Sequence, residues 1–265
     1  IEDVILYAQE CGFKVIPEYK FLRANNNKVF MELLKSKIFS KKFNNLRTKS
    51  YGAFEDVNLK TIKYPVIIKE AAGAMSSGVF LAKCEKEFVS IAKRISRTKS
   101  YKSDIKDALR FLKHKNYIKE SLYRKKFVIQ EFIQNLKSDY KVLIWGERYY
   151  IFERPVRNND FRASGSGNEK YIYGSHVDLP EGIFNFSKQV FNQLNVPQLS
   201  LDIAYDGTTF YIIEYQVIYF GTVGHVLSDG FFLLIKGEWK FISEKLDLEQ
   251  VYAESIDFYI KESCN

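Results

Sequence analysis

The sequence predicts an α+β fold in which helices alternate with antiparallel strands, and three observations support this class. The 265 residues are 46% hydrophobic and 16% aromatic, which is sufficient for a substantial core. Short runs of β-branched and aromatic residues are joined by turn residues, as at Gly146-Glu147 and Asp206-Gly207. Longer stretches with helical spacing of apolar residues lie between these runs.

The N-terminal half is expected to form helices around one short strand pair. Residues 1–50 favour helical pieces, including a helix at 28–38 that follows Asn25-Asn26-Asn27. Its expected apolar side consists of Val29, Phe30, Leu33, Leu34 and Ile38. Residues 40–60 are polar and rich in turn residues. Strands are expected at 65–70 and 79–83, and helices at 85–97 and 103–113, the second of which is rich in lysine.

The C-terminal half is richer in strands. Strands are expected at 126–133, 140–145 and 148–156, followed by a helix at 181–195, a hairpin over 199–215 and a helix near 246–262. A tight turn at Asp206-Gly207 places residue 202 opposite residue 211.

Composition excludes several classes of protein. The longest apolar runs are shorter than the roughly 18 to 20 residues that span a bilayer, so we expect no membrane partner. Cys11, Cys84 and Cys264 show neither metal-ligand nor disulfide spacing, which indicates a reducing, cytoplasmic location. The net charge of +8 suits polyanions such as nucleotide phosphates, but the lysines spread along the chain and argue against a nucleic-acid partner. A homodimer is a further expectation.

Lys69 ends an apolar strand and is followed at once by the small-residue loop AAGAMSSG at 71–78. A cation beside exposed backbone N–H groups is suited to bind phosphate oxygens. The alternative is a surface lysine before an ordinary loop. The loop lacks the Walker spacing, so a P-loop fold is not supported.

Asp202 and Glu214 are carboxylates within otherwise apolar strands, and buried carboxylates are costly unless they are paired or bind a metal. With Gln216 on the face of Glu214, they could form a hard-cation site for Mg²⁺. The alternative is that both carboxylates form salt bridges with some of the 40 basic residues.

Arg154, Arg157 and Arg162 fall within nine residues, near Asp160 and ahead of two glycines. Guanidinium groups bind carboxylates and phosphates in bidentate geometry, so this segment favours an anion site. The alternative is a hairpin that merely carries surface arginines.

The order of these features resembles the ATP-grasp superfamily, and most closely its branch of RimK, the ribosomal-protein glutamate ligase, over about residues 28–220. The resemblance implies two α/β lobes whose antiparallel sheets clasp ATP, with the N-terminal pre-grasp domain largely absent. It divides the chain into a pre-grasp remnant with a leading helix at 1–60, an N-lobe at 61–135 and a C-lobe at 136–265.

The resemblance also assigns roles to individual residues. Lys28 and Lys69 match the two lysines that contact ATP, and the loop with Ser76, Ser77 and Gly78 matches the mobile phosphate lid. VIQEFI (128–133) resembles the adenine hinge, in which Glu131 or its neighbour takes the amino group and the backbone of Phe132 and Ile133 reads the ring edge. Asp139 falls where an acidic residue meets the ribose or the substrate lobe.

In the C-lobe, Asp202 and Glu214 match the two metal-binding acids, with Gln216 where asparagine is usual. Arg154 and Arg162 match the substrate segment and would face the transferring phosphoryl group. Lys141 replaces the usual arginine of an Asp-x-Arg element, and Ala163-Ser164 replaces the usual serine and asparagine.

The resemblance implies an ATP- and Mg²⁺-dependent ligase that joins a carboxylate to an amine through an acyl phosphate. The arginine segment indicates an anionic small molecule or peptide as acceptor: a peptide, an amino acid or a cell-surface sugar acid. Two alternatives stay open. One is an ATP-grasp kinase that phosphorylates a hydroxyl, and the other is a nucleotide-binding module without turnover.

Overall fold

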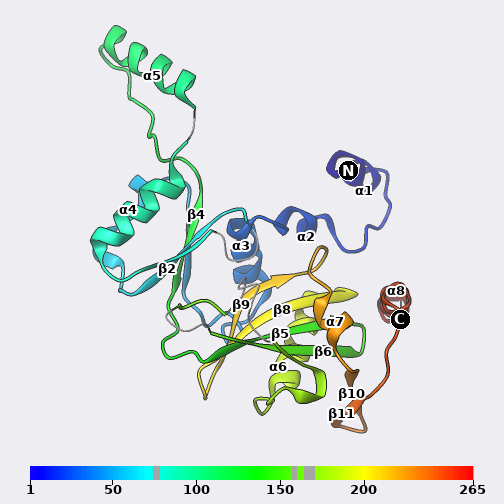
Figure 1. The fold of residues 1–265 in the computed structure, drawn as a ribbon. Coiled ribbons are helices and arrows are strands. Elements are labelled where there is room, and N and C mark those ends of the chain that lie inside the picture. The colour runs from blue at the N-terminus through cyan, green and yellow to red at the C-terminus, as the bar shows by residue number, and fades with distance from the viewer. Residues whose placement is uncertain (74–77, 99, 157–159, 164–170, 265) are drawn as a thin grey trace. The chain divides into compact units, whose positions relative to one another are not determined.

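The computed structural model describes residues 1–73, 78–98, 100–156, 160–163 and 171–264. In these ranges the chain forms helices and antiparallel strands (Figure 1), which confirms the α+β class. The chain divides into two compact units. Unit 1 comprises residues 1–25, 33–46 and 133–265, and unit 2 comprises residues 26–32 and 47–132. No described helix has the length and apolarity that crossing a bilayer requires.

Unit 2 is built on a four-stranded antiparallel sheet in the order β1-β4-β2-β3. Its strands are β1 (Thr48–Tyr51), β2 (Val66–Glu70), β3 (Val79–Ala82) and β4 (Phe127–Glu131). The predicted strands at 65–70 and 79–83 are therefore confirmed, whereas β1 lies in a segment that was expected to be loop. In the part of the chain that the structure describes, strand β1 pairs with β4 alone, and none of its residues is buried. This edge strand therefore forms without the apolar run by which a strand is recognised in a sequence.

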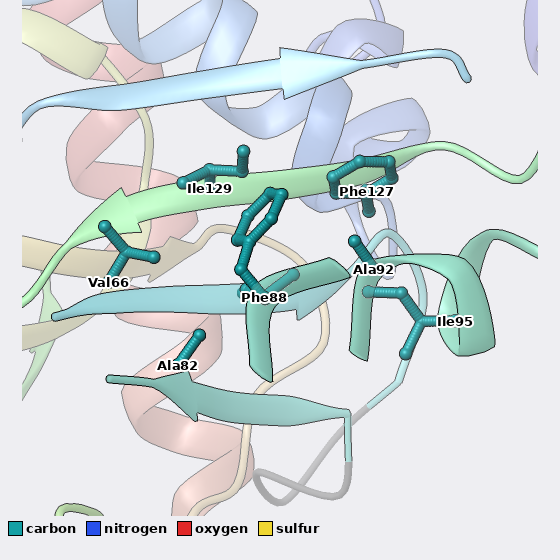
Figure 2. Close-up of a cluster of buried hydrophobic side chains, with 8 residues drawn as sticks. Val66, Ala82, Phe88, Ala92, Ile95, Phe127 and Ile129 are labelled. Atoms are coloured by element: carbon teal, nitrogen blue, oxygen red, sulfur yellow. The ribbon is translucent and has the colours of Figure 1, made fainter. Parts of the chain in front are cut away.

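The core of unit 2 lies between this sheet and helix α4 (Glu85–Ser96). Figure 2 shows Phe88, Ala92 and Ile95 of α4 directed toward the strands, where they pack with Val66 and Phe127. Because side chains alternate along a strand, Ile68 shares the face of Val66, and Lys69 lies on the opposite face. Helix α4 therefore covers the face of Val66 and Ile68, and not the face that carries Lys69. The unit also holds α5 (Tyr101–Lys113) and the short 3₁₀ helices η1 (Phe54–Asp56) and η2 (Leu59–Thr61).

Unit 1 is built on a larger antiparallel sheet in the order β11-β10-β6-β5-β8-β9, with β7 paired to β6. The strands are β5 (Ser138–Trp145), β6 (Arg148–Pro155), β7 (Ile172–Tyr173), β8 (Gln198–Tyr205), β9 (Phe210–Gln216), β10 (Phe231–Ile235) and β11 (Glu238–Ile242). The Gly146-Glu147 turn joins β5 and β6 as predicted, and Gly146 adopts a φ of +57° there.

Helices cover both faces of this sheet. Helix α6 (Ile183–Leu194) lies on one face, where the ring of Phe184 contacts that of Tyr149 at 6.1 Å between centroids. The other face carries a cluster that includes Leu143, Trp145 and Phe152. Helix α7 (Val223–Leu227) packs against Phe152, and α8 (Leu248–Cys264) adds Val251 to the cluster. The face covered by α7 and α8 also carries Asp139, Arg154 and Asp202. Asp139 and Arg154 are cross-strand partners, and each lies an even number of residues from a cluster member on its own strand. Asp202 is opposite Lys141, which lies on the same face.

The N-terminal helices are α1 (Glu2–Glu10), α2 (Tyr19–Ala24) and α3 (Lys28–Ile38). Helix α3 forms where it was predicted, but only part of its expected apolar side is buried. Leu34 is buried, whereas Leu33 is 54% exposed. Lys28, Glu32 and Lys35 are also buried. These three charged residues follow the i, i+4, i+7 spacing of one helix face. Lys35 Nζ donates to the Ile212 carbonyl oxygen at 2.8 Å, so a hydrogen bond compensates for burial of its charge.

The β8–β9 hairpin also differs from its prediction. Its loop has four residues rather than two, because the Asp206 carboxylate accepts hydrogen bonds from the backbone of Thr208 and Thr209. A β-bulge follows at Asp202-Ile203. Together the longer loop and the bulge place Asp202 opposite Glu214, so the predicted pairing with residue 211 is wrong.

Candidate nucleotide and metal site

Lys69 is buried on strand β2, which lies between β4 and β3 in the sheet of unit 2. It is 6% exposed and is directly opposite Val128 on β4 and Val79 on β3. Directly opposite residues in an antiparallel pair share one face, so aliphatic side chains flank the lysine on both sides. A buried lysine between two valines is unusual, because lysine is rarely buried in proteins. It distinguishes Lys69 from the surface lysine of the alternative interpretation.

Lys28 contacts the loop that follows Lys69. Its Nζ donates to the Gly73 carbonyl oxygen at 2.5 Å, and its backbone N–H donates to the Ala71 carbonyl oxygen at 2.8 Å. From the same turn, Asn26 Oδ1 accepts from the Gly73 N–H at 2.8 Å. Asn26 has a φ of +52°, a conformation that asparagine tolerates better than most residues. The structure therefore brings both predicted phosphate-binding lysines to the start of the 71–78 loop.

Gly78 closes this loop at its far end. The Glu70 N–H donates to the Gly78 carbonyl oxygen at 2.8 Å, and a Cβ on Gly78 would lie 3.0 Å from the Glu70 Cβ. A larger residue would therefore press on the end of β2. Ser76 and Ser77, the expected lid residues, lie outside the described residues.

Glu131, predicted at the adenine hinge, forms a paired contact with an arginine. Its two carboxylate oxygens accept from Arg47 Nη2 at 2.7 Å and Arg47 Nε at 3.1 Å. The hydrogen bond from Arg47 lowers the pKa of Glu131. Glu131 is opposite Val66, so its side chain is on the α4 side of the sheet, away from the face of Lys69. Arg47 was missed because the polar segment around it carries no strand signal.

The hinge residues Phe132 and Ile133 are half-buried and follow β4 directly. Phe132 is the last residue of unit 2, and Ile133 starts the C-terminal part of unit 1. Their predicted role in reading the adenine edge involves backbone groups and stays a prediction.

Four charged residues of unit 1 alternate in sign across three strands. Arg154 Nε donates to Asp139 Oδ1 at 2.5 Å, and Arg154 Nη2 lies 3.2 Å from Asp202 Oδ2. Lys141 Nζ donates to the second Asp202 oxygen, Oδ1, at 2.8 Å. Asp139 and Arg154 are each 5% exposed, so their charges are compensated mainly by one another. The salt-bridge alternative for Asp202 is thus present in the structure.

The electrostatics of the two aspartates differ. Burial raises the pKa of Asp139 to about 6, against the opposing effect of Arg154. Burial acts in the same direction on Asp202, but Arg154 and Lys141 outweigh it and lower the pKa of that carboxyl below its ordinary value. Arg154 also loses solvation, yet the two aspartates raise its pKa and keep it charged. Asp202 is therefore the carboxylate of this group that stays ionised most readily.

Arg154 is buried, and its guanidinium lies between Asp139 and Asp202. Its expected role toward a transferring phosphoryl group stays a prediction. Asp139, expected near the ribose, faces Arg154. Asp139 and Lys141 are two residues apart on one strand, so the sequence alone could have shown that they share a face. The pairing of Lys141 with Asp202 adds Asp202 to that face. We interpret Arg154 and Lys141 as residues that position Asp202.

Glu214 completes the acidic strand pair. It is half-buried and directly opposite Asp202, and Gln216 is two residues further along the same face, opposite Ser200. Directly opposed side chains in a sheet have Cβ atoms about 4.5–5.5 Å apart, close enough for two carboxylates to share one cation. Ser200 Oγ is buried and has no hydrogen-bond partner among the described residues. The donor set is thus all oxygen, which fits Mg²⁺.

Asp202 already interacts with two cations: it accepts a hydrogen bond from Lys141 Nζ and forms an ion pair with Arg154 Nη2 at 3.2 Å. An ionised carboxylate has about four lone-pair sites, so Asp202 keeps capacity for a metal. The described residues contain no group of three or more His, Cys, Asp and Glu side chains that could bind a metal by itself. A pair of carboxylates is nevertheless compatible with Mg²⁺, which is usually held by one or two carboxylates, with water and phosphate oxygens as its other ligands.

Arg162 pairs with a near neighbour. Its Nη2 and Nε donate to Asp160 Oδ2 at 2.8 and 3.0 Å, and this contact lowers the pKa of Asp160. The guanidinium remains about one-third exposed, whereas Arg154 is buried. Arg157 and most of the stretch after Arg162 lie outside the described residues.

No protein-family model matches this sequence, and no curated protein matches it. Solved structures do match it. The L-amino acid ligase from Bacillus licheniformis has a TM-score of 0.55 and 15% identity over 87% of this chain and 52% of its own. The N5-carboxyaminoimidazole ribonucleotide synthetase, in its ADP complex, gives 0.56 and 10% over 87% of this chain and 54% of its own.

The D-alanine–D-alanine ligase from Bacillus anthracis, complexed with ATP, has a TM-score of 0.52 and 14% identity over 98% of this chain and 74% of its own. This chain spans about half the length of the first two proteins. At these identities the likeness concerns the fold. The two antiparallel sheets and their match to these ligases show that this chain has the ATP-grasp fold.

Proposed function

We propose that this chain is the nucleotide-binding part of an ATP- and Mg²⁺-dependent ligase that joins a carboxylate to an amine. The observation that carries the proposal is the acidic strand pair: Asp202 and Glu214 are direct cross-strand partners on one sheet face. The ATP-grasp fold and the buried Lys69 support it. Membership of the RimK branch stays a prediction.

In this proposal the lysines of unit 2 bind ATP. Phosphoryl transfer depends on positioning and charge neutralisation, and two buried cations near one loop suit both needs. Lys28 is fixed by its hydrogen bond to Gly73, so its ammonium is preorganised. Lys69 would neutralise phosphate oxygens from a buried position between Val79 and Val128, where a charge interacts more strongly than it does in bulk water.

The acids of unit 1 would hold the metal. Mg²⁺ bound by Asp202, Glu214 and Gln216 would neutralise charge on the phosphates during transfer to the carboxylate substrate. Arg154 and Lys141 keep Asp202 ionised and fix its orientation. The Arg162 side chain is about one-third exposed, and we assign it to the anionic acceptor.

A nucleotide-binding module without turnover is the second candidate. The observation that favours it is the double pairing of Asp202 with Lys141 and Arg154, which competes with a metal for the same oxygens. A kinase is the third possibility, but no contact in the described residues favours a hydroxyl acceptor over an amine.

The test is a screen of carboxylate and amine pairs with Mg-ATP that follows ADP, free phosphate and product mass. A ligase releases ADP and phosphate only when both substrates are present. A kinase releases ADP and a phosphorylated product without free phosphate, and a binding module retains ATP unchanged. Lys69→Ala and Glu214→Gln serve as inactive controls. Failure of the protein to bind Mg-ATP at all would overturn all three assignments.

A further inference from the structure

Helix α5 exposes its apolar residues to solvent. Tyr101, Ile105, Leu109 and Leu112 are between 60 and 81% exposed, and at helical spacing they fall within one arc of roughly 80°. The buried residue of α5 is Asp107, which faces elsewhere and accepts from the Tyr117 hydroxyl at 2.6 Å. A surface helix usually buries its apolar residues and exposes its charged ones, whereas α5 buries an aspartate and exposes leucines. Exposed apolar arcs of this kind mark interaction surfaces in proteins.

Basic residues line the edge of this arc. Lys102, Lys106, Arg110 and Lys113 follow the spacing i, i+4, i+8 and i+11, which places them on an adjoining strip of the helix. Long basic side chains beside an apolar strip can extend toward polar headgroups while their methylene groups cover apolar surface.

The positive charge of the protein is concentrated around α5. Residues 93–126 contain 13 lysines and arginines against 3 acidic residues, a net charge of +10. Because the whole chain carries +8, the remaining residues together carry −2. Lysines do occur along the whole chain, but the excess of positive over negative charge lies in this one segment.

We propose that α5 is an interfacial helix that docks the protein on a bilayer surface rich in anionic lipids. The apolar arc would enter the boundary between headgroups and acyl chains, and the basic strip would lie among the negative headgroups. The proposal rests on exposure, spacing and charge, and it stands whether or not the ligase assignment is correct.

Three other occupants fit less well. Nucleic acid would use the cations but leave Ile105, Leu109 and Leu112 in water, because its phosphates offer no aliphatic surface. A second copy of this face would bring two segments of net charge +10 together. An acidic protein could use both strips, and the experiment below separates it from a membrane.

The experiment is flotation of the full chain with vesicles of phosphatidylcholine alone or mixed with phosphatidylserine. We expect binding to the mixed vesicles, weak binding to the neutral ones, and release at high salt. Ile105→Ser with Leu112→Ser should weaken binding about tenfold or more. Lys102→Glu with Lys106→Glu should weaken it by at least about 30-fold.

Matched controls come from unit 1. Ile256→Ser with Ile260→Ser removes two exposed apolar side chains of α8, and Lys236→Glu with Lys245→Glu removes two exposed cations. Both control pairs should float like the unmodified protein. Circular dichroism checks that every variant keeps its helical content.

Four outcomes would overturn the proposal: no flotation of the unmodified protein, equal flotation with neutral vesicles, retention of binding by the α5 variants, or equal loss in the control pairs. Binding to polyglutamate without vesicle binding would assign the surface to an acidic protein. Binding to single-stranded RNA alone would assign it to nucleic acid.

Discussion

Asp202 and Glu214 lie directly opposite each other on β8 and β9, yet only Asp202 is engaged by cations among the described residues. The two acids of one candidate metal site therefore have different structural roles. Asp202 belongs to a buried charge network, whereas Glu214 is available to a ligand. This asymmetry can be tested by substituting each acid with its amide.

Glu214→Gln should leave the free energy of unfolding within about 0.5 kcal/mol, because no described protein group depends on its charge. Asp202→Asn should cost about 2–4 kcal/mol, since Lys141 and Arg154 lose part of their compensation. Both variants should lose the Mg²⁺-dependent part of ATP binding. Urea unfolding and nucleotide titration with and without Mg²⁺ measure these effects. Equal stability losses, or unchanged binding, would contradict the metal assignment.

Arg154→Leu should destabilise the protein by about 3–5 kcal/mol, because it leaves Asp139 buried without its cation. Adding Asp139→Leu should recover part of this loss, since the uncompensated charge then disappears. A double-mutant cycle from urea unfolding gives the coupling between the two residues. Additive losses would show that Arg154 and Asp139 act independently and would contradict the network.

Gly224→Ala should destabilise the protein by about 1–3 kcal/mol. A Cβ at this position would lie 2.5 Å from a ring carbon of Phe152 and 3.1 Å from Leu143 Cδ1, so α7 must move away from the sheet. Gly221→Ala is the matched control, because nothing lies within 4 Å of its added Cβ. Thermal unfolding compares the two variants. A Gly224→Ala protein as stable as the control would mean that α7 does not pack as described.

Asp206→Ala should cost about 1 kcal/mol at neutral pH, because the carboxylate accepts hydrogen bonds from Thr208, Thr209 and Tyr211. These bonds lower the pKa of Asp206 from 3.8 to about 2. A lowered pKa means that the carboxylate stabilises the fold above about pH 4 and loses this effect as the pH falls toward 2.

The difference in unfolding free energy between the unmodified protein and Asp206→Ala should therefore shrink between pH 5 and pH 2. Asp206→Asn keeps an acceptor that does not titrate and should show no such narrowing. A difference that is constant with pH would show that the carboxylate's charge does not hold the β8–β9 loop.

Helices and strands were predictable where residue type, apolar spacing and turn residues indicate the same element. Val66–Glu70, Ile183–Leu194 and the Gly146-Glu147 hairpin follow from β-branched runs, helical spacing and turn residues. Strand β1 was not predictable, because an edge strand with no buried residue has no hydrophobic pattern. The burial of Lys35 on α3 was not predictable, since the carbonyl oxygen that accepts its hydrogen bond belongs to Ile212, far away in the sequence.

The acidic pair shows the same limit in the candidate site. By itself the sequence determined that Asp202 and Glu214 sit in neighbouring strands of one hairpin, because carboxylates in apolar runs around a turn are visible at the level of residues. Only the tertiary structure decided that they are opposite each other and that Lys141 and Arg154 hold one of them. Loop length, a bulge and pairing with β5 and β6 set these contacts, and such long-range registers depend on interactions that no local pattern records.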